Sequence, residues 1–250
     1  MSGLLTRRAV LTGLAGTLVA GCDRLGESER FRSILYGAER LNLRAQRLLV
    51  DRTALAPEFS AADLSPVFRP NGTRLPGTSD YAAHMAEGFA GWRLDIDGLV
   101  ARPLSFRMDQ LLRLPRRTQI TRHDCVEGWS AIGQWTGVPL RLLLEAAGMR
   151  DSARFIVFHC ADRYGSIPYY ETIDMVDALH PQTIIAYGLN GRRLPVANGA
   201  PLRLRVERQL GYKHAKYVNR IEAVASLDGI GLGKGGFWED RADYEWFAGI

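Results

Sequence analysis

The chain has 250 residues, of which 46% are hydrophobic, 24% charged and 9% aromatic. These are the fractions of an ordinary globular protein, so they exclude a disordered, collagen-like or coiled-coil chain. With 32 Lys and Arg against 27 Asp and Glu, the net charge of +5 is mild. It favours an anionic ligand or surface over nucleic acid, whose binding proteins cluster positive charge more strongly.

Residues 1–21 are typical of an export signal. Arg7 and Arg8 stand directly before the apolar run 9–20. This run is shorter than the ~20 residues that span a bilayer, and it suits the hydrophobic part of a signal peptide. The paired arginines indicate a twin-arginine signal, with an ordinary secretory signal as the alternative. We therefore expect the protein to be exported.

The apolar run ends in Val19-Ala20-Gly21-Cys22, which resembles the lipobox of bacterial lipoproteins. It predicts that Cys22 is acylated and becomes the mature N-terminus; plain cleavage at small residues is the alternative. Asp23 directly after it resembles a signal for retention in the inner membrane. The expected location is the periplasmic side of the cytoplasmic membrane, with the lipid holding the protein to the membrane surface.

Beyond the signal, helix and strand patterns alternate without an evident linker after residue 80. Apolar residues at three- and four-residue spacing predict a helix over 28–52, and a Pro- and Gly-rich stretch predicts a long loop over 57–80. Strands are expected at 92–98, 119–122, 153–158, 183–187, 202–206 and 216–225. Short helices are expected at 105–114 and 139–147. The GxGxxG of Gly231–Gly236 is expected to be a loop, since too few residues follow it for a dinucleotide-binding unit.

The densest group of chemically active residues is the segment around Cys125, which also holds Arg122, His123, Asp124 and Glu127. Positive neighbours favour a thiolate, and thiolates suit transition metals. Three interpretations follow from the residues alone. Cys125 could form a structural disulfide with Cys160, share a Cys/His metal site with His123 and His159, or bind the metal of a cofactor.

Two blocks of sequence resemble the sulfite oxidase family, and within it the periplasmic methionine sulfoxide reductases in particular. The first block is His123-Asp-Cys125-Val-Glu-Gly-Trp129 with Gly137-Val-Pro-Leu140; the second is Asn198–Val206 with Gly211–Lys216. The resemblance covers about residues 65–225. It implies an α+β architecture, the mixed α/β molybdopterin-binding fold, as a single domain. That domain would span residues 65–250, after an N-terminal helix and loop over residues 22–64.

The resemblance also implies roles for individual residues. Cys125 would be the protein ligand to molybdenum in a Mo-molybdopterin cofactor. The remaining cofactor-binding residues would be Asn71, Cys160, Asn198, Arg203, His214, Ala215 and Lys216. Charge and position alone suggest Arg122 and Arg205 as catalytic residues of an anion pocket. We expect His159 and His180 to be ordinary, partly buried histidines, and Trp129 and Trp135 to be core residues.

The implied activity is oxygen-atom transfer to or from a small oxyanion, sulfoxide or N-oxide. The chain has no room for a haem domain or a dimerisation domain, so electrons would pass through a separate haem protein, either a membrane cytochrome b or a c-type cytochrome. No nucleic acid is expected as a partner. The alternative is a cofactor-free exported binding protein on the same fold, with Cys125 and Cys160 joined as a disulfide.

Overall fold

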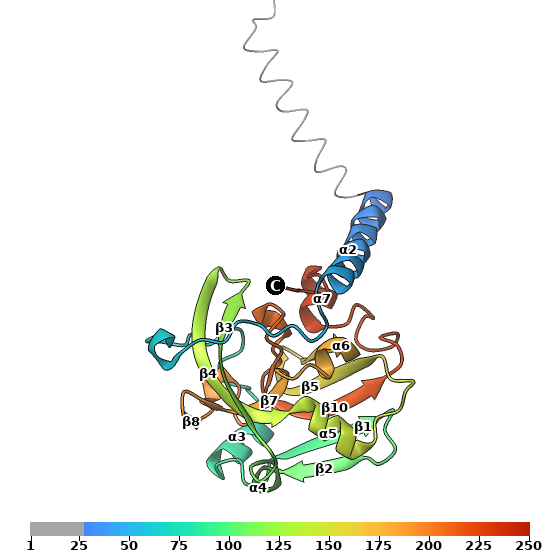
Figure 1. The fold of residues 1–250 in the computed structure, drawn as a ribbon. Helices are drawn as coiled ribbons and strands as arrows, with labels where there is room; N and C mark the ends of the chain where they lie inside the picture. Colours follow the sequence, from blue (N-terminus) through green and yellow to red (C-terminus); the bar gives the residue numbers. More distant parts are fainter. Residues whose placement is uncertain (1–27) are drawn as a thin grey trace, which may run out of the picture. The chain divides into compact units, whose positions relative to one another are not determined.

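A computed structural model of the chain describes residues 28–250 (Figure 1). The chain divides into two compact units, residues 1–51 and residues 52–250, which we describe separately. The expected signal, with its paired arginines, Cys22 and Asp23, lies outside the described residues. Within residues 28–250, no helix is both long enough and apolar enough to cross a membrane.

The first unit has one described helix, α2 (Glu29–Leu49), which confirms the helix expected over residues 28–52. Its apolar residues recur at the spacing that places them on one helical face. The helix ends where Val50 takes an extended conformation and donates its backbone N–H to the carbonyl of Gln46, at 2.9 Å.

The second unit contains two five-stranded sheets. The first has the strand order β2 (Leu104–Arg107), β1 (Arg93–Gly98), β10 (Val218–Val224), β5 (Phe155–Tyr164), β6 (Ile167–Asp174). The β1–β10 pair is parallel and the other neighbours are antiparallel. Alternating apolar residues of these strands, such as Ile96, Ile156 and Ile221, are fully buried in the main core. The strands β1 and β2 alternate between less exposed and more exposed residues, whereas β5 and β6 are buried over several successive residues.

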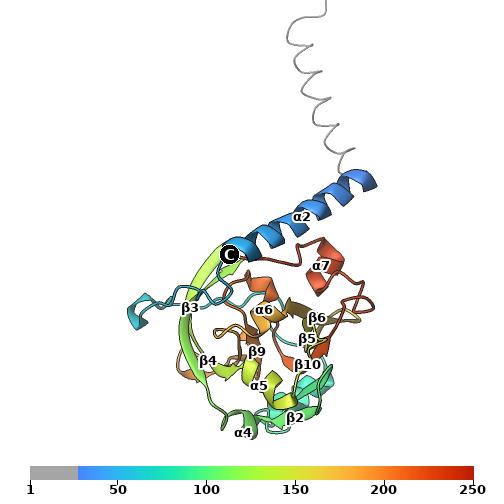
Figure 2. The same cartoon turned by 45° about the vertical axis from the view of Figure 1, so that its right-hand side comes forward.

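The second sheet has the order β3 (Arg117–Cys125), β4 (Trp129–Pro139), β7 (Ile184–Leu189), β8 (Arg192–Arg193), and β9 (Arg203–Arg205) also pairs with β7. Figure 2 shows β3 and β4 as two long, strongly curved strands. Gly137 lies at a register shift between β4 and β7, where a Cβ would lie 2.2 Å from the carbonyl oxygen of Ile185. Only glycine allows these strands to approach so closely.

Short helices connect the strands: η1 (Ala61–Asp63), α3 (Ser79–Ala86), α4 (Met108–Leu111), α5 (Leu140–Ala147), α6 (Met175–Ala178), η2 (Val196–Asn198), η3 (Gly211–Lys213) and α7 (Phe237–Ala242). The helix expected at 139–147 is α5, which ends at Gly148 in the left-handed region. The expected strands are present as β1, β3, β5, β7, β9 and β10, with shifted ends.

The expected helix over 105–114 is wrong at its start. Residues 104–107 form β2 instead, because Leu104 and Phe106 alternate with exposed residues and pack beside β1. The helix α4 begins only at Met108, where Gln110 reaches back to accept the backbone N–H of Arg107 at 2.8 Å.

A buried ion cluster ties the C-terminal segment to the rest of the unit. The Nζ of Lys213 donates to Glu171 of β6 and, at 2.6 Å, to Glu239 of α7, and all three residues are fully buried. One cation thus faces two carboxyl groups. Burial and the neighbouring Glu239 raise the pKa of Glu171 well above its usual range, so the cluster holds a proton as well as the lysine charge.

Candidate active site

Cys125 is the last residue of β3, where the chain turns into β4. The strands pair as far as Cys125 and Trp129, and Gly128 closes the turn in the left-handed region while donating its N–H to the carbonyl of Cys125 at 3.0 Å. The side chain is half-buried. Burial raises the pKa of the Cys125 thiol, against the opposing effect of the Glu127 backbone. The protein alone therefore favours the thiol, and a bound cation would be needed to favour the thiolate.

Arg203 is carried by β9 into the interior, with 0% of its surface exposed. Its Nη1 donates to the carbonyl of Asn198 at 3.1 Å and its Nη2 to the Oδ1 of Asn71 at 3.0 Å. Burial and the nearby Arg205 lower the pKa of Arg203 to about 9. A guanidinium that is buried without a carboxylate is costly to keep, so this position favours an anionic ligand.

Lys216 is a second buried cation beside it. Its Nζ donates to the backbone carbonyls of Asn71 at 2.6 Å, Ala197 at 3.0 Å and Thr73. Burial and the charge of Arg203 lower the pKa of Lys216 to about 7. Arg203 and Lys216, called the cation pair below, are thus held in place mainly by neutral oxygens.

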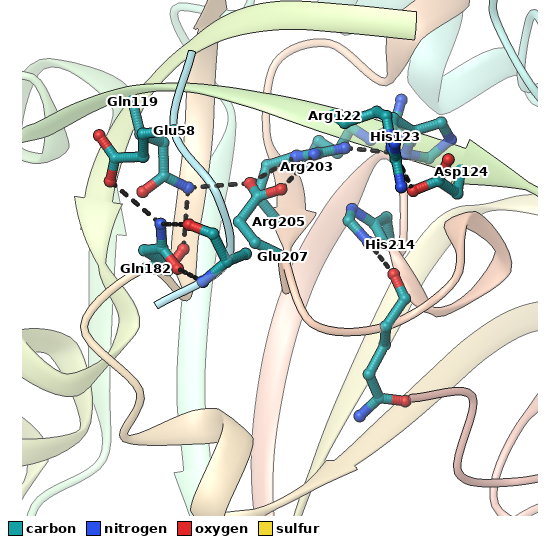
Figure 3. A network of polar contacts seen from close by, with 12 residues as sticks. Glu58, Gln119, Arg122, His123, Asp124, Gln182, Arg203, Arg205, Glu207 and His214 are labelled. Carbon is teal, nitrogen blue, oxygen red and sulfur yellow. Dashed lines mark hydrogen bonds and ion pairs between the residues drawn. The ribbon is translucent and has the colours of Figure 1, made fainter. Parts of the chain in front are cut away.

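Behind the cation pair lies a polar network, shown in Figure 3. Arg205 binds the carboxylate of Glu207 through Nε, at 2.9 Å, and Nη2, and its Nη1 donates to the Nδ1 of His123 at 2.9 Å. Gln119 adds a third bond to Glu207, at 2.8 Å. The Trp135 ring lies 4.3 Å from the Arg205 guanidinium carbon and 5.2 Å from that of Arg203, a cation–π arrangement.

His123 and His214 meet edge to face in this network, with ring centroids 5.0 Å apart. His214 donates its Nε2–H to the carbonyl of Gln209 at 3.0 Å. Burial, followed by nearby positive charge, lowers the pKa of both histidines well below the usual value. Both rings are therefore neutral and keep the positive charge of the site on the arginines and Lys216.

A cavity of about 150 Å³ opens beside Cys125. The long loop contributes Asn71, Gly72 and Thr73 to its lining. The other lining residues are Cys125, Val126, Glu127, Asp162, Tyr164, Tyr169, Tyr212, His214, Lys216, Trp238 and Tyr244. Five of these side chains, called the aromatic wall below, form one group: Tyr164, Tyr169, Tyr212, Trp238 and Tyr244. The wall joins the C-terminal segment to the sheet, since the Trp238 ring packs edge to face against Tyr164 of β5, with ring centroids 5.2 Å apart.

The structure brings several of the residues expected from the sequence together. Asn71, Cys125, His214 and Lys216 line the cavity. Asn198 and Arg203 lie behind it and are linked to it through Asn71. Cys160 and Ala215 are buried in the main core and are not among the lining residues.

Arg122 and Arg205 are not among the lining residues either. Arg122 lies exposed, three positions before Cys125 and hence on the other face of β3, and pairs with Asp124 at 2.9 Å. Arg205 is occupied by Glu207 and His123. An anion pocket built from these two arginines is therefore not present at the cavity.

The competing interpretations of Cys125 lack support in the structure. Cys125 and Cys160 are both free thiols. No group of three or more His, Cys, Asp or Glu residues within 28–250 could hold a metal ion by itself. His159 instead pairs with Glu222 at 2.8 Å, and His180 bonds to the carbonyl of Ala54 at 3.0 Å, as expected of ordinary histidines.

Comparison with known proteins decides the family. Residues 82–228 match the family described as "Oxidoreductase molybdopterin binding domain". Over 98% of its length, the chain is also 37% identical to a protein of Azospira oryzae provisionally named protein-methionine-sulfoxide reductase subunit YedZ1, of which it covers 86%. The chain belongs to the molybdopterin-binding oxidoreductases.

Further relatives of this molybdopterin-binding oxidoreductase are also named as oxidoreductases that act on sulfur compounds. Proteins named protein-methionine-sulfoxide reductase catalytic subunit MsrP match in Campylobacter jejuni (34% identity, 70% of this chain and 68% of the relative) and in Ralstonia nicotianae (37% identity, 53% and 44%). Among solved structures, the sulfane dehydrogenase SoxCD from Paracoccus pantotrophus matches with a TM-score of 0.50 and 27% identity, over 55% of this chain and 39% of that chain. These matches confirm the expected sulfite oxidase-like fold and family.

The residues present fit a molybdopterin, which carries a phosphate and binds a metal through sulfur. The cation pair has no carboxylate partner among the ion pairs of the described residues, as a phosphate site requires. The Nδ2 of Asn198 and the Nε of Arg203 are buried polar atoms without a partner in the described part of the chain. A thiol, Cys125, is available at the cavity for a soft metal.

Sequence reasoning missed the aromatic wall and the carboxyl group of Asp162. The wall comes from three segments that are distant in the chain, and no local pattern links them. Asp162 lies within β5 but beyond the end of the strand expected at 153–158, and no motif in the sequence marks it. The one available signal was the aromatic composition of the C-terminal tail.

Proposed function

We propose that this oxidoreductase reduces sulfoxides, with methionine sulfoxide in proteins as its substrate class. The names of three relatives, protein-methionine-sulfoxide reductases from three bacteria, support this class of substrate. N-oxides carry a polar N–O bond in a group without net charge, as sulfoxides carry a polar S–O bond. They are therefore the nearest alternative substrates. Small oxyanions are disfavoured by the charges of the cavity.

The observation that carries the proposal is the lining of the cavity beside Cys125. Two carboxyl groups, Glu127 and Asp162, and the five-residue aromatic wall surround it, whereas its one cation, Lys216, already donates to three carbonyls among the described residues. The exposed carboxylate of Glu127 repels an oxyanion such as sulfite. Aromatic rings favour contact with a sulfur-containing, uncharged group. The cavity therefore suits a sulfoxide better than sulfite.

Individual residues then have defined tasks. The thiolate of Cys125 would bind the molybdenum, and Asn71, Asn198, Arg203 and Lys216 would hold the pterin and its phosphate. When bound, the cofactor supplies oxygen-atom exchange coupled to two electrons. The aromatic wall would orient the sulfoxide and exclude water from its surroundings.

Electrons would come from a separate haem protein. Two relatives are named as catalytic subunits, and this name supports a second subunit that supplies the electrons. The exported, lipid-anchored location expected from residues 1–23 would place the enzyme near a membrane cytochrome. Cell fractionation of the wild type and of Cys22→Ser checks this location. Release of the variant from the membrane is expected, and an unchanged membrane fraction would contradict the lipid anchor.

The first experiment is metal and pterin analysis of protein purified from a host that makes molybdenum cofactor. About one molybdenum and one pterin per chain are expected, together with reduction of methionine sulfoxide by an artificial electron donor. Cys125→Ser should abolish turnover and leave pterin bound. Unchanged turnover of Cys125→Ser would refute the ligand assignment. Folded protein without molybdenum and pterin, with Cys125 bonded to Cys160, would instead establish the cofactor-free alternative.

A further inference from the structure

Asp162 is a buried carboxyl group at the cavity with no function assigned so far. It lies on β5, is 3% exposed, and lines the same cavity as Cys125. The aromatic residues Tyr164 and Tyr169 line the cavity beside it. Its side chain therefore faces the place where a substrate would sit next to Cys125.

No cation neutralises Asp162 among the ion pairs of residues 28–250. Lys216 is near enough to influence it, but the Lys216 ammonium donates to the carbonyls of Asn71, Thr73 and Ala197. The hydroxyl of Thr73 donates to the Asp162 carboxyl, and its Oδ1 has no partner within the described residues. A buried carboxylate in this setting is costly, and a protonated carboxyl group is favoured.

The other carboxyl group of the cavity, Glu127, differs from Asp162 in its exposure and in its hydrogen bonds. Glu127 is exposed, and its oxygens accept bonds from the Trp129 indole at 3.0 Å and from the Gly72 backbone at 3.5 Å. It is therefore solvated and already engaged. Of the two carboxyl groups that line the cavity, Asp162 is the one that combines burial with an oxygen that has no partner within residues 28–250.

Reduction of a sulfoxide consumes protons. The balanced reaction is R₂SO + 2 H⁺ + 2 e⁻ → R₂S + H₂O, in which sulfur is reduced, the S–O bond breaks and two O–H bonds form. The electrons come from the separate haem protein that would serve as the electron donor of this enzyme. Asp162 is 3% exposed and lines the cavity beside Cys125, so its carboxyl group is placed to deliver one of these protons to the departing oxygen.

We propose that Asp162 is the general acid of this enzyme and gives its carboxyl proton to the oxygen that leaves the sulfoxide. The carboxylate then regains a proton from solvent before the next turnover. This inference rests on the proposed function, because it needs a substrate oxygen that ends as water.

The charges around Asp162 agree with this role. Burial raises its pKa to about 6, against the opposing effects of the Thr73 hydroxyl and of Lys216. The other titratable groups that feel its charge are Tyr81, Cys160, Tyr169 and Tyr217, whose pKa values are all raised, so they stay neutral in this range. A general acid works best with a pKa near the working pH.

The test uses purified holoenzyme with molybdenum and pterin measured in each sample. Asp162→Asn keeps the shape of the protonated carboxyl group but cannot supply its proton, and we expect kcat for methionine sulfoxide to fall about 10²-fold or more. In the wild type, kcat should decline as the pH rises through about 6; this decline should be absent in Asp162→Asn. Asp162→Glu should recover part of kcat, and Asp95→Asn, an exposed carboxylate of β1, is the matched control.

A second measurement is independent of turnover. Infrared difference spectra of the holoenzyme should show a protonated carboxyl band that is lost in Asp162→Asn and that titrates near pH 6 in the wild type. Wild-type kcat in Asp162→Asn overturns the proposal, as does a loss of activity matched by an equal loss of pterin, or an infrared titration with no protonated Asp162. A cofactor-loaded wild type that does not reduce sulfoxides overturns the proposed function itself, even if the infrared band is present.

Discussion

The Oδ1 of Asn71 accepts a hydrogen bond from the Nη2 of Arg203 at 3.0 Å, although 132 residues separate the two in the chain. The backbone carbonyl of Asn71 also accepts from Lys216, at 2.6 Å. The long loop is thus fastened to both members of the cation pair by neutral oxygens, which position the charges without cancelling them. The site is therefore built for an anion before any anion binds.

Replacing Arg203 should separate cofactor binding from folding. In Arg203→Gln, a charge-assisted bond to the cofactor is lost, which is worth about 1.5–3 kcal/mol, or about a 10- to 150-fold loss of pterin affinity. The cofactor-free protein should be as stable as the wild type or more so, because an unpaired buried cation is removed. Pterin content after purification and urea unfolding of cofactor-free protein measure the two effects.

Arg113→Gln is the control for this prediction, since the Arg113 side chain is 80% exposed and pairs only with Asp109 on the surface. It should change neither pterin content nor stability. Full pterin content in Arg203→Gln would show that the anionic part of the cofactor does not depend on the cation pair.

The buried ion cluster of Lys213 gives a prediction about the C-terminal segment. Lys213→Met leaves Glu171 and Glu239 buried without a cation, so we expect a loss of about 3–5 kcal/mol in unfolding free energy. Glu239→Gln should lower the unfolding free energy far less, because the cluster then keeps one lysine and one carboxylate and no longer needs to hold a proton. Urea unfolding and limited proteolysis of the segment after residue 228 distinguish the two variants; equal losses would contradict a proton shared in the cluster.

The sequence was sufficient where structure depends on local periodicity or on contiguous motifs. The alternation in β1 and the apolar run of β7 were predicted because each strand has its own pattern. The strand β4 was missed, although Ala131, Gly133 and Trp135 occupy its buried positions in strict alternation. Its two glycines weaken the strand signal. They are needed because a Cβ at Gly133 would lie 2.8 Å from the Phe68 ring and one at Gly137 would lie 2.2 Å from the carbonyl oxygen of Ile185.

The anion pocket predicted from Arg122 and Arg205 rested on charge and position alone, and the structure does not place these residues at the cavity. Arg122 and Cys125 differ by three positions on one strand, so alternation places them on opposite faces, and this could have been predicted from the sequence. Burial of both Arg203 and Arg205 could not, because it depends on Trp135, whose ring meets both guanidinium groups only in the folded protein. The aromatic wall escaped prediction for the same reason.

Asp162 should make the stability of the cofactor-free protein depend on pH. Its pKa is about 6 when folded and near 3.8 when unfolded, so the folded state binds more protons between these values. Stability from this group is therefore fully present at the acid end and falls as the pH rises to about 6. Asp162→Asn avoids the penalty, and we expect it to be more stable than the wild type by about 1–3 kcal/mol at about pH 8, with little difference at about pH 4.

Urea unfolding of both cofactor-free proteins across this range measures the difference. Asp95→Asn should show no such trend, since its carboxylate is exposed in β1. A constant difference between Asp162→Asn and the wild type at all pH values would mean that the pKa of Asp162 is the same in the folded and unfolded protein, which contradicts the prediction.

Trp238 provides the sharpest test of the aromatic wall. It belongs to α7, lines the cavity, and stacks on Tyr244 with ring centroids 5.9 Å apart. A sulfur–aromatic contact is worth about 0.3–1.5 kcal/mol, so Trp238→Ala should raise KM for a methionine sulfoxide peptide by up to about tenfold, whereas Trp238→Phe should recover most of the loss. Because Trp238 is not among the residues proposed to hold the cofactor, molybdenum and pterin content should stay at wild-type levels in both variants. If KM is unchanged and only cofactor content falls, the wall supports the cofactor site and does not contact the substrate.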